Sequence, residues 1–276
     1  MNAPWSDGEP IAATPPGVMG WLRASLRGIG LVFALSGLLV VLLILRGVER
    51  PFSGPRRPLS GAVPKWASRA ALWLLGIAHR TTGSQMPHTG AVVANHAGWL
   101  DIFVLNAPKQ VFFVSKAEVA RWPVIGFMAR AAGTVFINRD RREAGAHVAL
   151  FEHRLRAGHK LLFFPEGTST DSRRVLPFKT TLFAAFYGPE LHDLMYIQPV
   201  SVIYHAPQGE DPRFYGWWGD MGFGSHLIKV LAAPRQGQVE LIYHPPVRVA
   251  DFPNRKALAA YCEDQIRNGH NQATAP

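Results

Sequence analysis

The feature that most constrains this chain is an uncharged apolar run close to its N-terminus. No charged residue occurs between Ile29 and Leu45, and arginines flank the run on both sides. A bilayer core about 30 Å thick is crossed by roughly 20 apolar residues, and this run just reaches the lower bound of about 17. We therefore expect a flexible tail over residues 1–17, rich in Pro, Ala and Gly, and a membrane-anchoring helix over residues 18–50.

Two other structures are compatible with the same run. A cleaved signal peptide needs a small-residue cleavage site, whereas the charged segment RGVER, residues 46–50, follows the run directly. A buried helix of a soluble domain also fits, because the run is short for a membrane span. Lys and Arg are more frequent after the run than before it, so the positive-inside rule predicts that the rest of the chain lies on the cytoplasmic side of the inner membrane.

The overall charge indicates an anionic partner. The 276 residues include 29 Lys and Arg against 19 Asp and Glu, a formal net charge of +10. Nucleic acid, anionic lipid and an acidic substrate all fit this charge, but the apolar run favours an anionic membrane surface, and the sequence has no nucleic-acid-binding motif. The single cysteine, Cys262, excludes an intramolecular disulfide and a thiolate-rich zinc site, so neither a metal nor a resident cofactor is expected.

Residues 51–64 contain four prolines and are predicted to be a linker. The next residues, 65–79, have helical periodicity, with one face formed by Trp66, Ala70, Trp73, Leu74 and Ile77. Such a face fits a helix packed on the domain core. Two tryptophans and basic flanks beside an anchor also fit an amphipathic helix at the membrane interface, and both descriptions can hold together.

From Gly90 onward, β-rich runs alternate with helical stretches. Strands are predicted at residues 91–94, 110–114, 134–137, 161–164, 197–204 and 239–243. Helices are predicted at residues 99–106, 117–131, 142–157, 182–187 and 255–268. This alternation predicts an α/β domain, which we place at residues 65–276, with a mostly parallel central sheet flanked by helices.

The segment NHAGWLD, residues 95–101, ends the first of these strands and leads into a helix. In α/β sheets, such strand-to-helix junctions are where ligands meet the protein. His96 and Asp101 are too far apart for one helical face, so we expect His96 in the turn and Asp101 reaching back from the helix. A carboxylate held in this way orients an imidazole as general base for an alcohol. The pair by itself also fits a loop histidine with an incidental carboxylate.

Three further segments accompany this pair in order along the chain. They are GTVFINR at residues 133–139, FPEGT at residues 164–168 and IQPVS at residues 197–201. Together with NHAGWLD, they resemble the ordered blocks of the glycerolipid (lysophospholipid) acyltransferase family, which includes the 1-acyl-glycerol-3-phosphate acyltransferases. The resemblance covers residues 65–246.

The resemblance implies an O-acyltransferase in the membrane. Such an enzyme moves a fatty acyl chain from acyl carrier protein or CoA, which serves as co-substrate, to the free hydroxyl of a lysolipid acceptor. By the same resemblance, His96 is the general base and Asp101 is its orienting partner. No covalent enzyme intermediate is implied, and Cys262 lies far from every block.

The resemblance also implies residues that bind the substrate. Glu166, Gly167 and Thr168 would position the acceptor. Arg139 would hold its phosphate or other polar head group, because a planar guanidinium suits bidentate contact with an anion. Lys116 stands where many members have a lysine after a strand, and it could bind an anion or stabilise an oxyanion; a solvated surface lysine is the alternative.

One position departs from the phosphatidic-acid-forming pattern. Those members usually have an arginine directly after FPEGT, where this chain has Ser169. This version resembles the branch that acylates lyso-ornithine lipid and other lyso-aminolipids. Arg173 or Arg174 could supply the missing charge, so a phosphate head group and an amino-acid head group both remain open.

Two other classes of protein are weighed against the acyltransferase. A membrane-anchored lipid hydrolase or thioesterase could use the same His96 and Asp101, although the sequence has no Gly-x-Ser-x-Gly elbow. A non-enzymatic binder of anionic membranes would account for the net charge alone. Release of free fatty acid without an acceptor would distinguish the hydrolase, and unchanged lipid composition on deletion would distinguish the binder.

Overall fold

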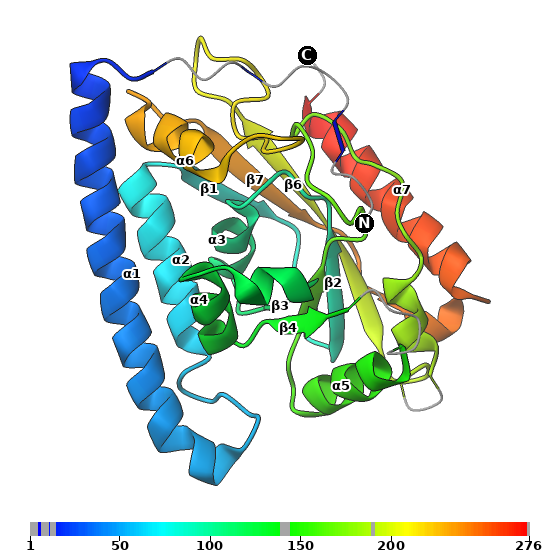
Figure 1. Ribbon diagram of the computed structural model, residues 1–276. Coiled ribbons are helices and arrows are strands. Elements are labelled where there is room, and N and C mark those ends of the chain that lie inside the picture. The colour runs from blue at the N-terminus through cyan, green and yellow to red at the C-terminus, as the bar shows by residue number, and fades with distance from the viewer. Residues whose placement is uncertain (1–4, 7–10, 12–14, 139–143, 189–190, 275–276) are drawn as a thin grey trace.

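The chain folds into an α/β architecture with one central sheet (Figure 1). The computed structural model describes residues 5–6, 11, 15–138, 144–188 and 191–274. The strands are β1 (Ala78–Thr82), β2 (Gly90–Ala94), β3 (Phe112–Lys116), β4 (Val135–Ile137), β5 (Leu161–Phe163), β6 (Tyr196–His205), β7 (Gln238–Tyr243) and β8 (Val247–Arg248). The α-helices are α1 (Val18–Ser53), α2 (Ala62–Leu75), α3 (Asp101–Asn106), α4 (Ile125–Ala132), α5 (Ala144–Arg156), α6 (Phe223–Ala232) and α7 (Arg255–Thr274).

Within the described residues, the strand order is β1-β7-β6-β2-β5-β3-β4, with β8 beside β6. Every pair is parallel except β6 with β7 and β6 with β8. The predicted α/β class with a mostly parallel sheet is therefore confirmed. The central strand β2, with sequence GAVVA, is buried along its whole length, as expected for an apolar run covered on both faces.

Helices cover both faces of the sheet. One face is covered by α2, α3 and α6, with α1 outside them, and the other face by α5 and α7. Each face has its own apolar cluster, which packs the helices onto the strands. The carboxyl ends of the parallel strands β2 and β5 thus emerge at the same edge, between the two helical layers.

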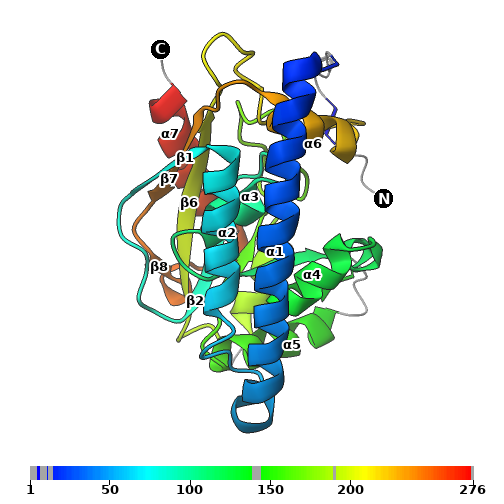
Figure 2. The same cartoon turned by 90° about the vertical axis from the view of Figure 1, so that its left-hand side faces the viewer.

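The long helix α1 lies along the side of the domain and contacts α2, α6 and α4 (Figure 2). Near its start, the Arg23 Nε atom donates to the Ala232 carbonyl at 2.9 Å, and the Arg27 Nη1 atom donates to the Leu231 carbonyl at 2.8 Å. Cations at these last carbonyls of α6 also complement its helix dipole. Near the other end, the buried Glu49 carboxylate accepts hydrogen bonds from Ser60. The start of α1 is therefore bound to α6, and its end is bound to the connection that leads to α2.

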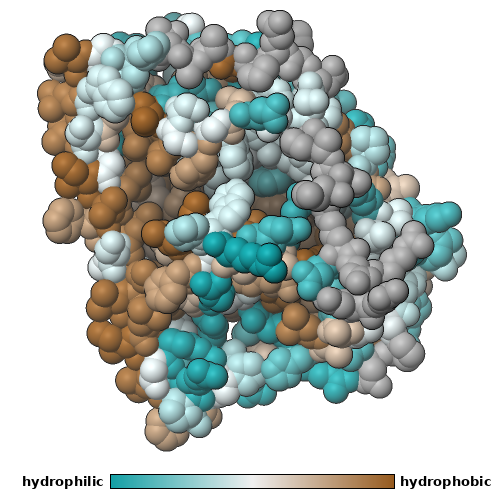
Figure 3. All heavy atoms as spheres, in the orientation of Figure 1, coloured by the Kyte–Doolittle hydropathy of each residue, from teal (hydrophilic) through white to brown (hydrophobic). Residues whose placement is uncertain are grey.

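The outward face of α1 is apolar and exposed. Val32, Phe33, Ile44 and Val48 are more than half exposed, and Figure 3 shows hydrophobic residues gathered along the edge that α1 forms. By length and composition, α1 is the one helix in the described part of the chain that could cross a membrane. This exposed apolar surface suggests membrane anchoring.

The linker expected over residues 51–64 is shorter than predicted. Helix α1 continues through Pro51 to Ser53, because a proline in the last turn removes only one backbone hydrogen bond. Helix α2 already begins at Ala62, with Pro64 in its first turn, where no hydrogen bond is lost. The connection between the two helices is residues 54–61.

The second helix also differs from its prediction. It ends at Leu75 because Gly76 adopts φ 78° and its N–H bonds to the Leu72 carbonyl. Residues 78 and 79 begin β1 instead. The predicted core face was wrong for the tryptophans: Leu72 and Leu75 are buried, whereas Trp66 is 56% and Trp73 is 79% exposed. The exposed tryptophans fit the interfacial alternative.

Strands β1 and β8 and helix α6 were not predicted from the sequence. Helix α6 has glycines at both sides of its start, and it is stabilised by packing on α1 and by the two arginines at its end. The helix predicted at residues 117–131 is divided into a 3₁₀ turn, Ala117–Arg121, and α4. Pro123 breaks it, since proline restricts the preceding residue and lacks a donor.

Candidate active site

The loop after β2 carries the predicted His–Asp pair. Strand β2 ends at Ala94, and the side chain of Asn95 then continues the sheet pairing. Its Oδ1 atom accepts from the Val202 N–H at 2.7 Å, and its Nδ2 atom donates to the Val202 carbonyl at 2.9 Å. His96 follows in the loop, and Asp101 is the first residue of α3. Asn95 therefore fixes the direction in which the chain leaves the sheet.

The His96 imidazole and the Asp101 carboxylate are in direct contact. The Nδ1 atom of His96 lies 2.7 Å from the Oδ2 atom of Asp101. The Asp101 side chain is 0% exposed and the His96 side chain is 23% exposed. A carboxylate can only accept, so Nδ1 carries the proton, and Nε2 of the neutral ring keeps its lone pair. Phe164 stacks on the imidazole at 4.0 Å between ring centroids and holds the ring plane.

The buried Asp101 carboxylate receives three further hydrogen bonds. Its Oδ2 atom accepts from the backbone N–H groups of Ala97 at 2.8 Å and Gly98 at 3.1 Å. Its Oδ1 atom accepts from the Tyr204 hydroxyl at 2.7 Å. Burial, and then the nearby Asp101 charge, raise the pKa of Tyr204 well above its ordinary value, so the phenol stays protonated and donates. These donors offset the cost of burying the carboxylate.

The FPEGT segment clamps the His96 loop from the neighbouring strand. Glu166 is 1% exposed, and its two carboxylate oxygens accept from the backbone N–H groups of His96 at 2.8 Å and Leu176 at 3.0 Å. Thr170 donates to the His96 carbonyl from its backbone N–H at 2.9 Å and from its hydroxyl at 3.2 Å. Burial raises the pKa of Glu166 to about 8, against the effect of these hydrogen bonds. The position of His96 thus depends on residues far along the chain.

The other predicted site residues lie at the same edge of the sheet or outside the described part. Gly167 and Thr168 continue the loop beside His96, and Lys116 is the last residue of β3. Arg139 lies outside the residues that the structure describes. The substrate contacts expected of all of these residues, and of Glu166, stay predictions; the structure adds that the Glu166 carboxylate is bound to the backbone of the His96 loop.

The aromatic segment FYGWWGDMGF, residues 214–223, covers the same loop. The N–H of Trp217 donates to the Ala97 carbonyl at 2.9 Å, and a Cβ added to Gly98 would lie 3.0 Å from that of Trp217. The glycine in NHAGWLD thus permits this close approach. Trp5, expected in a flexible tail, packs near Trp218. Its backbone N–H donates to the Thr168 hydroxyl at 3.3 Å. The rest of that tail lies mostly outside the described residues.

Tyr204 and Thr170 were not predicted to contribute to the site. Tyr204 lies in a strand whose sequence, YIQPVSVIYH, gives no sign that its hydroxyl points to Asp101. Thr170 is the second residue after the FPEGT block, so its position was a signal that the prediction did not use.

The described residues offer neither a metal site nor a thiolate nucleophile. They contain no group of three or more His, Cys, Asp or Glu that could hold a metal ion. Cys262 is buried in α7, on the far face of the sheet, and burial raises the pKa of its thiol. The His96 imidazole, which Asp101 orients and which is partly exposed, can accept and donate a proton.

Comparisons with known proteins show the family of this chain. The acyltransferase family model matches residues 79–203, which include the whole His96 loop and the FPEGT segment. A lyso-ornithine lipid O-acyltransferase of Rhodobacter capsulatus is 55% identical, over 97% of this chain and 97% of that protein. A 1-acyl-sn-glycerol-3-phosphate acyltransferase of Neisseria gonorrhoeae is 36% identical, over 76% of this chain and 84% of that protein. The crystal structure of PlsC from Thermotoga maritima, a 1-acyl-sn-glycerophosphate acyltransferase, has the same fold, with a TM-score of 0.64 and 20% identity over 94% of this chain and 96% of that one.

Proposed function

This chain belongs to the acyltransferase family, and we propose that it transfers a fatty acyl chain to the free hydroxyl of a lyso-ornithine lipid. The observation that carries the proposal is the hydrogen-bonded His96–Asp101 pair, which lies in a chain more than half identical to a lyso-ornithine lipid O-acyltransferase over nearly its full length. The acyl donor is a thioester of acyl carrier protein or CoA.

In the proposed reaction, His96 acts as general base. The acceptor hydroxyl donates its hydrogen bond to Nε2 and attacks the thioester carbonyl, so that a C–O bond forms and the C–S bond breaks. The proton passes to the imidazole and then to the leaving thiolate. Asp101 stabilises the imidazolium during the step, and its four hydrogen bonds keep it from moving. General-base assistance of this kind contributes about 10²- to 10⁴-fold to the rate.

The surroundings of Ser169 support an amino-acid head group over a phosphate. Ser169 takes the place where an arginine would offer a fixed cation to a phosphate. Arg174, one of the two nearby candidates for that charge, is paired with the buried Asp171 carboxylate at 3.0 Å, and the other, Arg173, is half-buried beside it. The charge of Arg174 is therefore partly neutralised by the protein itself. Arg139, Lys116, Gly167 and Thr168 are proposed to contact the acceptor or the thioester.

The placement of α1 supports a membrane-surface enzyme. The start of α1 is hydrogen-bonded to α6 and the helix packs on α2 and α4, so a perpendicular crossing would draw the domain into the bilayer. We therefore place α1 along the membrane, with its exposed apolar face and the exposed Trp66 and Trp73 of α2 in the lipid. The formal net charge of +10 favours the cytoplasmic leaflet, whose anionic lipids attract basic surfaces.

The test is acyl transfer by the purified full-length chain in mixed micelles. Lyso-ornithine lipid and lysophosphatidic acid are offered in parallel, with acyl carrier protein and CoA thioesters as donors. We expect diacylated ornithine lipid, and its loss in His96→Ala. Preferred acylation of lysophosphatidic acid would refute the proposed acceptor. Release of free fatty acid without any acceptor would indicate a hydrolase.

A further inference from the structure

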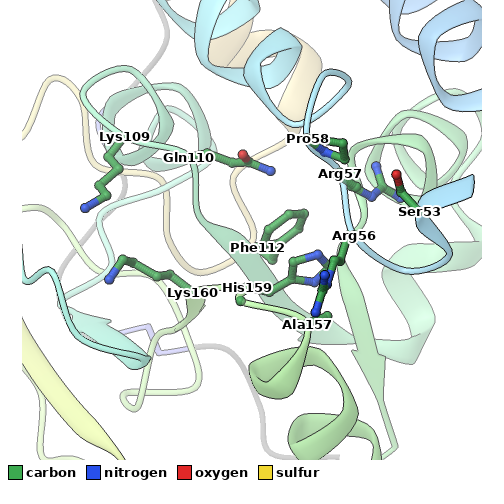
Figure 4. Close-up of a pocket in the computed structure, with 11 residues that line it drawn as sticks. Ser53, Arg56, Arg57, Pro58, Lys109, Gln110, Phe112, Ala157, His159 and Lys160 are labelled. Atoms are coloured by element: carbon green, nitrogen blue, oxygen red, sulfur yellow. The ribbon is translucent and has the colours of Figure 1, made fainter. Parts of the chain in front are cut away.

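A basic pocket lies at the opposite edge of the sheet from His96 (Figure 4). It has a volume of about 580 Å³ and is formed where the end of α1, the segment before β3 and the turn before β5 meet. Strands β2 and β5 are parallel, so Lys160, just before β5, and His96, just after β2, lie at opposite ends of the strands. The pocket is therefore separate from the catalytic loop.

Cations surround this pocket. Figure 4 shows Lys109 and Lys160 on one side of it, and Arg56 and Arg57 on the other. Among the described residues that line it, none is Asp or Glu. The acid closest in sequence, Glu49, is buried, and its carboxylate is bound by Ser60, by the Leu59 N–H and by Arg46. The lining therefore holds an excess of positive charge.

His159 gives a second, independent sign of a ligand. It lines the pocket, is 5% exposed and stacks on Phe112 at 4.0 Å between ring centroids. Within the described residues, neither of its ring nitrogens makes a hydrogen bond of good geometry, although the Pro55 backbone interacts with the ring. The buried Nε atom of Arg154, whose guanidinium lies over the same Phe112 ring, also has no hydrogen-bond partner in the described part of the chain. Buried polar groups without partners are rare and destabilising, so this end of the pocket lacks an acceptor-rich group.

Burial, and after it like-charge repulsion, disfavours the protonated forms of two groups that line the pocket. Burial, followed by Arg154 and Arg57, lowers the pKa of His159 to about 4. Burial and Lys109 lower the pKa of Lys160 to about 8. A bound anion would relieve both effects, because it favours the protonated form of each group.

We propose that this pocket binds the phosphate group of an anionic phospholipid from the membrane that holds α1. The guanidinium groups of Arg56 and Arg57 suit a phosphate, which offers more acceptor oxygens than a carboxylate. Lys109 and Lys160 add positive charge to the lining, and their ammonium groups also donate to the Met86 carbonyl at 3.3 Å and 2.8 Å. The pocket begins at Ser53, the last residue of α1, directly beside the exposed apolar side chains of Val48 and Phe52. The inference that the ligand carries a phosphate depends on the pocket alone. The inference that this phosphate belongs to a membrane lipid also rests on the proposed placement of α1.

The bound lipid would hold the end of α1 at the level of the lipid head groups. Arg57 already connects the segment after α1 to α4, because its Nη1 atom donates to the Ala131 carbonyl at 2.6 Å. A head group shared by Arg56, Lys109 and Lys160 would extend this connection to the segments before β3 and β5. The site orients the enzyme on the membrane and takes no part in acyl transfer.

The experiment measures lipid retention by the full-length chain in uncharged detergent micelles, using native mass spectrometry. Phosphatidylglycerol and phosphatidylcholine are titrated against wild type, against Arg56→Gln/Lys109→Gln and against the control Arg50→Gln/Lys65→Gln. The control removes the same charge from the same region but touches no residue that lines the pocket. Unfolding temperature and acyl transfer in micelles show that each variant is folded.

We expect phosphatidylglycerol to bind wild type at least about tenfold more tightly than phosphatidylcholine. The Arg56→Gln/Lys109→Gln variant loses at least about tenfold of that affinity, and the control changes by less than about twofold. Equal losses in both variants would reduce the effect to general surface charge and overturn the proposal, as would full retention by the pocket variant. Inorganic phosphate and CoA form further arms: tighter binding of either than of phosphatidylglycerol would overturn the assignment to a membrane lipid.

Discussion

The hydroxyl of Tyr204 donates a hydrogen bond of 2.7 Å to Asp101, 103 positions earlier in the chain. Asp101 in turn receives the Nδ1 proton of His96. The orientation of the proposed general base therefore depends on a tyrosine in β6 as well as on its own loop. This connection leads to the first prediction.

Replacing Tyr204 by Phe removes one donor from the buried carboxylate and leaves its Oδ1 atom unpaired. Hydrogen bonds to charged groups contribute about 1.5–3 kcal/mol, so we expect kcat to fall roughly tenfold or more, with little change in KM. Steady-state acyl transfer measures both constants. Tyr243→Phe is the control, since that buried hydroxyl contacts Gln85 outside the site. Equal losses of kcat in the two variants would contradict a positioning role for Tyr204.

Removal of the base itself should have a larger effect. We expect His96→Ala and Asp101→Asn to lower kcat by about 10²- to 10⁴-fold, because the first removes the proton acceptor and the second no longer holds the ring in one tautomer. The exposed pair of His192 and Asp193, also in contact at 2.9 Å, provides the control. His192→Ala should keep wild-type turnover; wild-type turnover in His96→Ala would show that another group is the base.

The raised pKa of Glu166 predicts that wild type and Glu166→Gln differ in stability by an amount that depends on pH. Glu166→Gln replaces one of the two accepting oxygens by an NH2 group, so either the His96 or the Leu176 backbone N–H loses its acceptor. We therefore expect a loss of about 1–3 kcal/mol in stability and a lower kcat. The folded-state pKa of Glu166 is raised to about 8 from 4.5. The stability linked to its proton is therefore complete below the lower value and is lost as the pH rises through the upper one.

The advantage of wild type over Glu166→Gln should consequently be larger near about pH 5 than near about pH 8. Urea unfolding of both proteins at the two pH values measures it. Glu263→Gln is the matched control, because Glu263 also accepts a backbone N–H, that of Phe178 at 2.7 Å, away from His96. It should lose stability without loss of kcat. An advantage that grows with pH would contradict the raised pKa.

The exposed face of α1 predicts how the enzyme holds the membrane. Phe33 is 76% exposed, and a phenylalanine contributes about 1.5–3 kcal/mol when it is buried in an apolar phase. We expect Phe33→Ser to weaken partitioning into lipid vesicles by roughly tenfold or more, as measured by flotation. Leu194→Ser removes a side chain that is 68% exposed but lies outside α1 and α2, and it should leave partitioning unchanged. Equal effects would argue against membrane contact through this face.

The features that depend on near neighbours were determined by the sequence. The apolar run produces α1, and the short β-branched and aromatic runs produce β2, β5 and β6 close to their predicted bounds. The spacing between His96 and Asp101 correctly required a turn and a helix start. The ordered blocks indicated the family before any contact was known.

Only the tertiary structure decided which distant groups complete the site. The parallel register of β2 and β5 brings Glu166 to the His96 loop, and the pairing of β2 with β6 brings Tyr204 to Asp101. The tertiary structure also decided that the tryptophans of α2 face outward, because the other sides of α2 pack on α1 and on the domain. Periodicity reports the apolar side of an element, but the partner that covers this side is set by the packing of segments far apart in the chain. The sequence therefore indicated the proposed base and its carboxylate, and the packed sheet determined what holds these two residues in place.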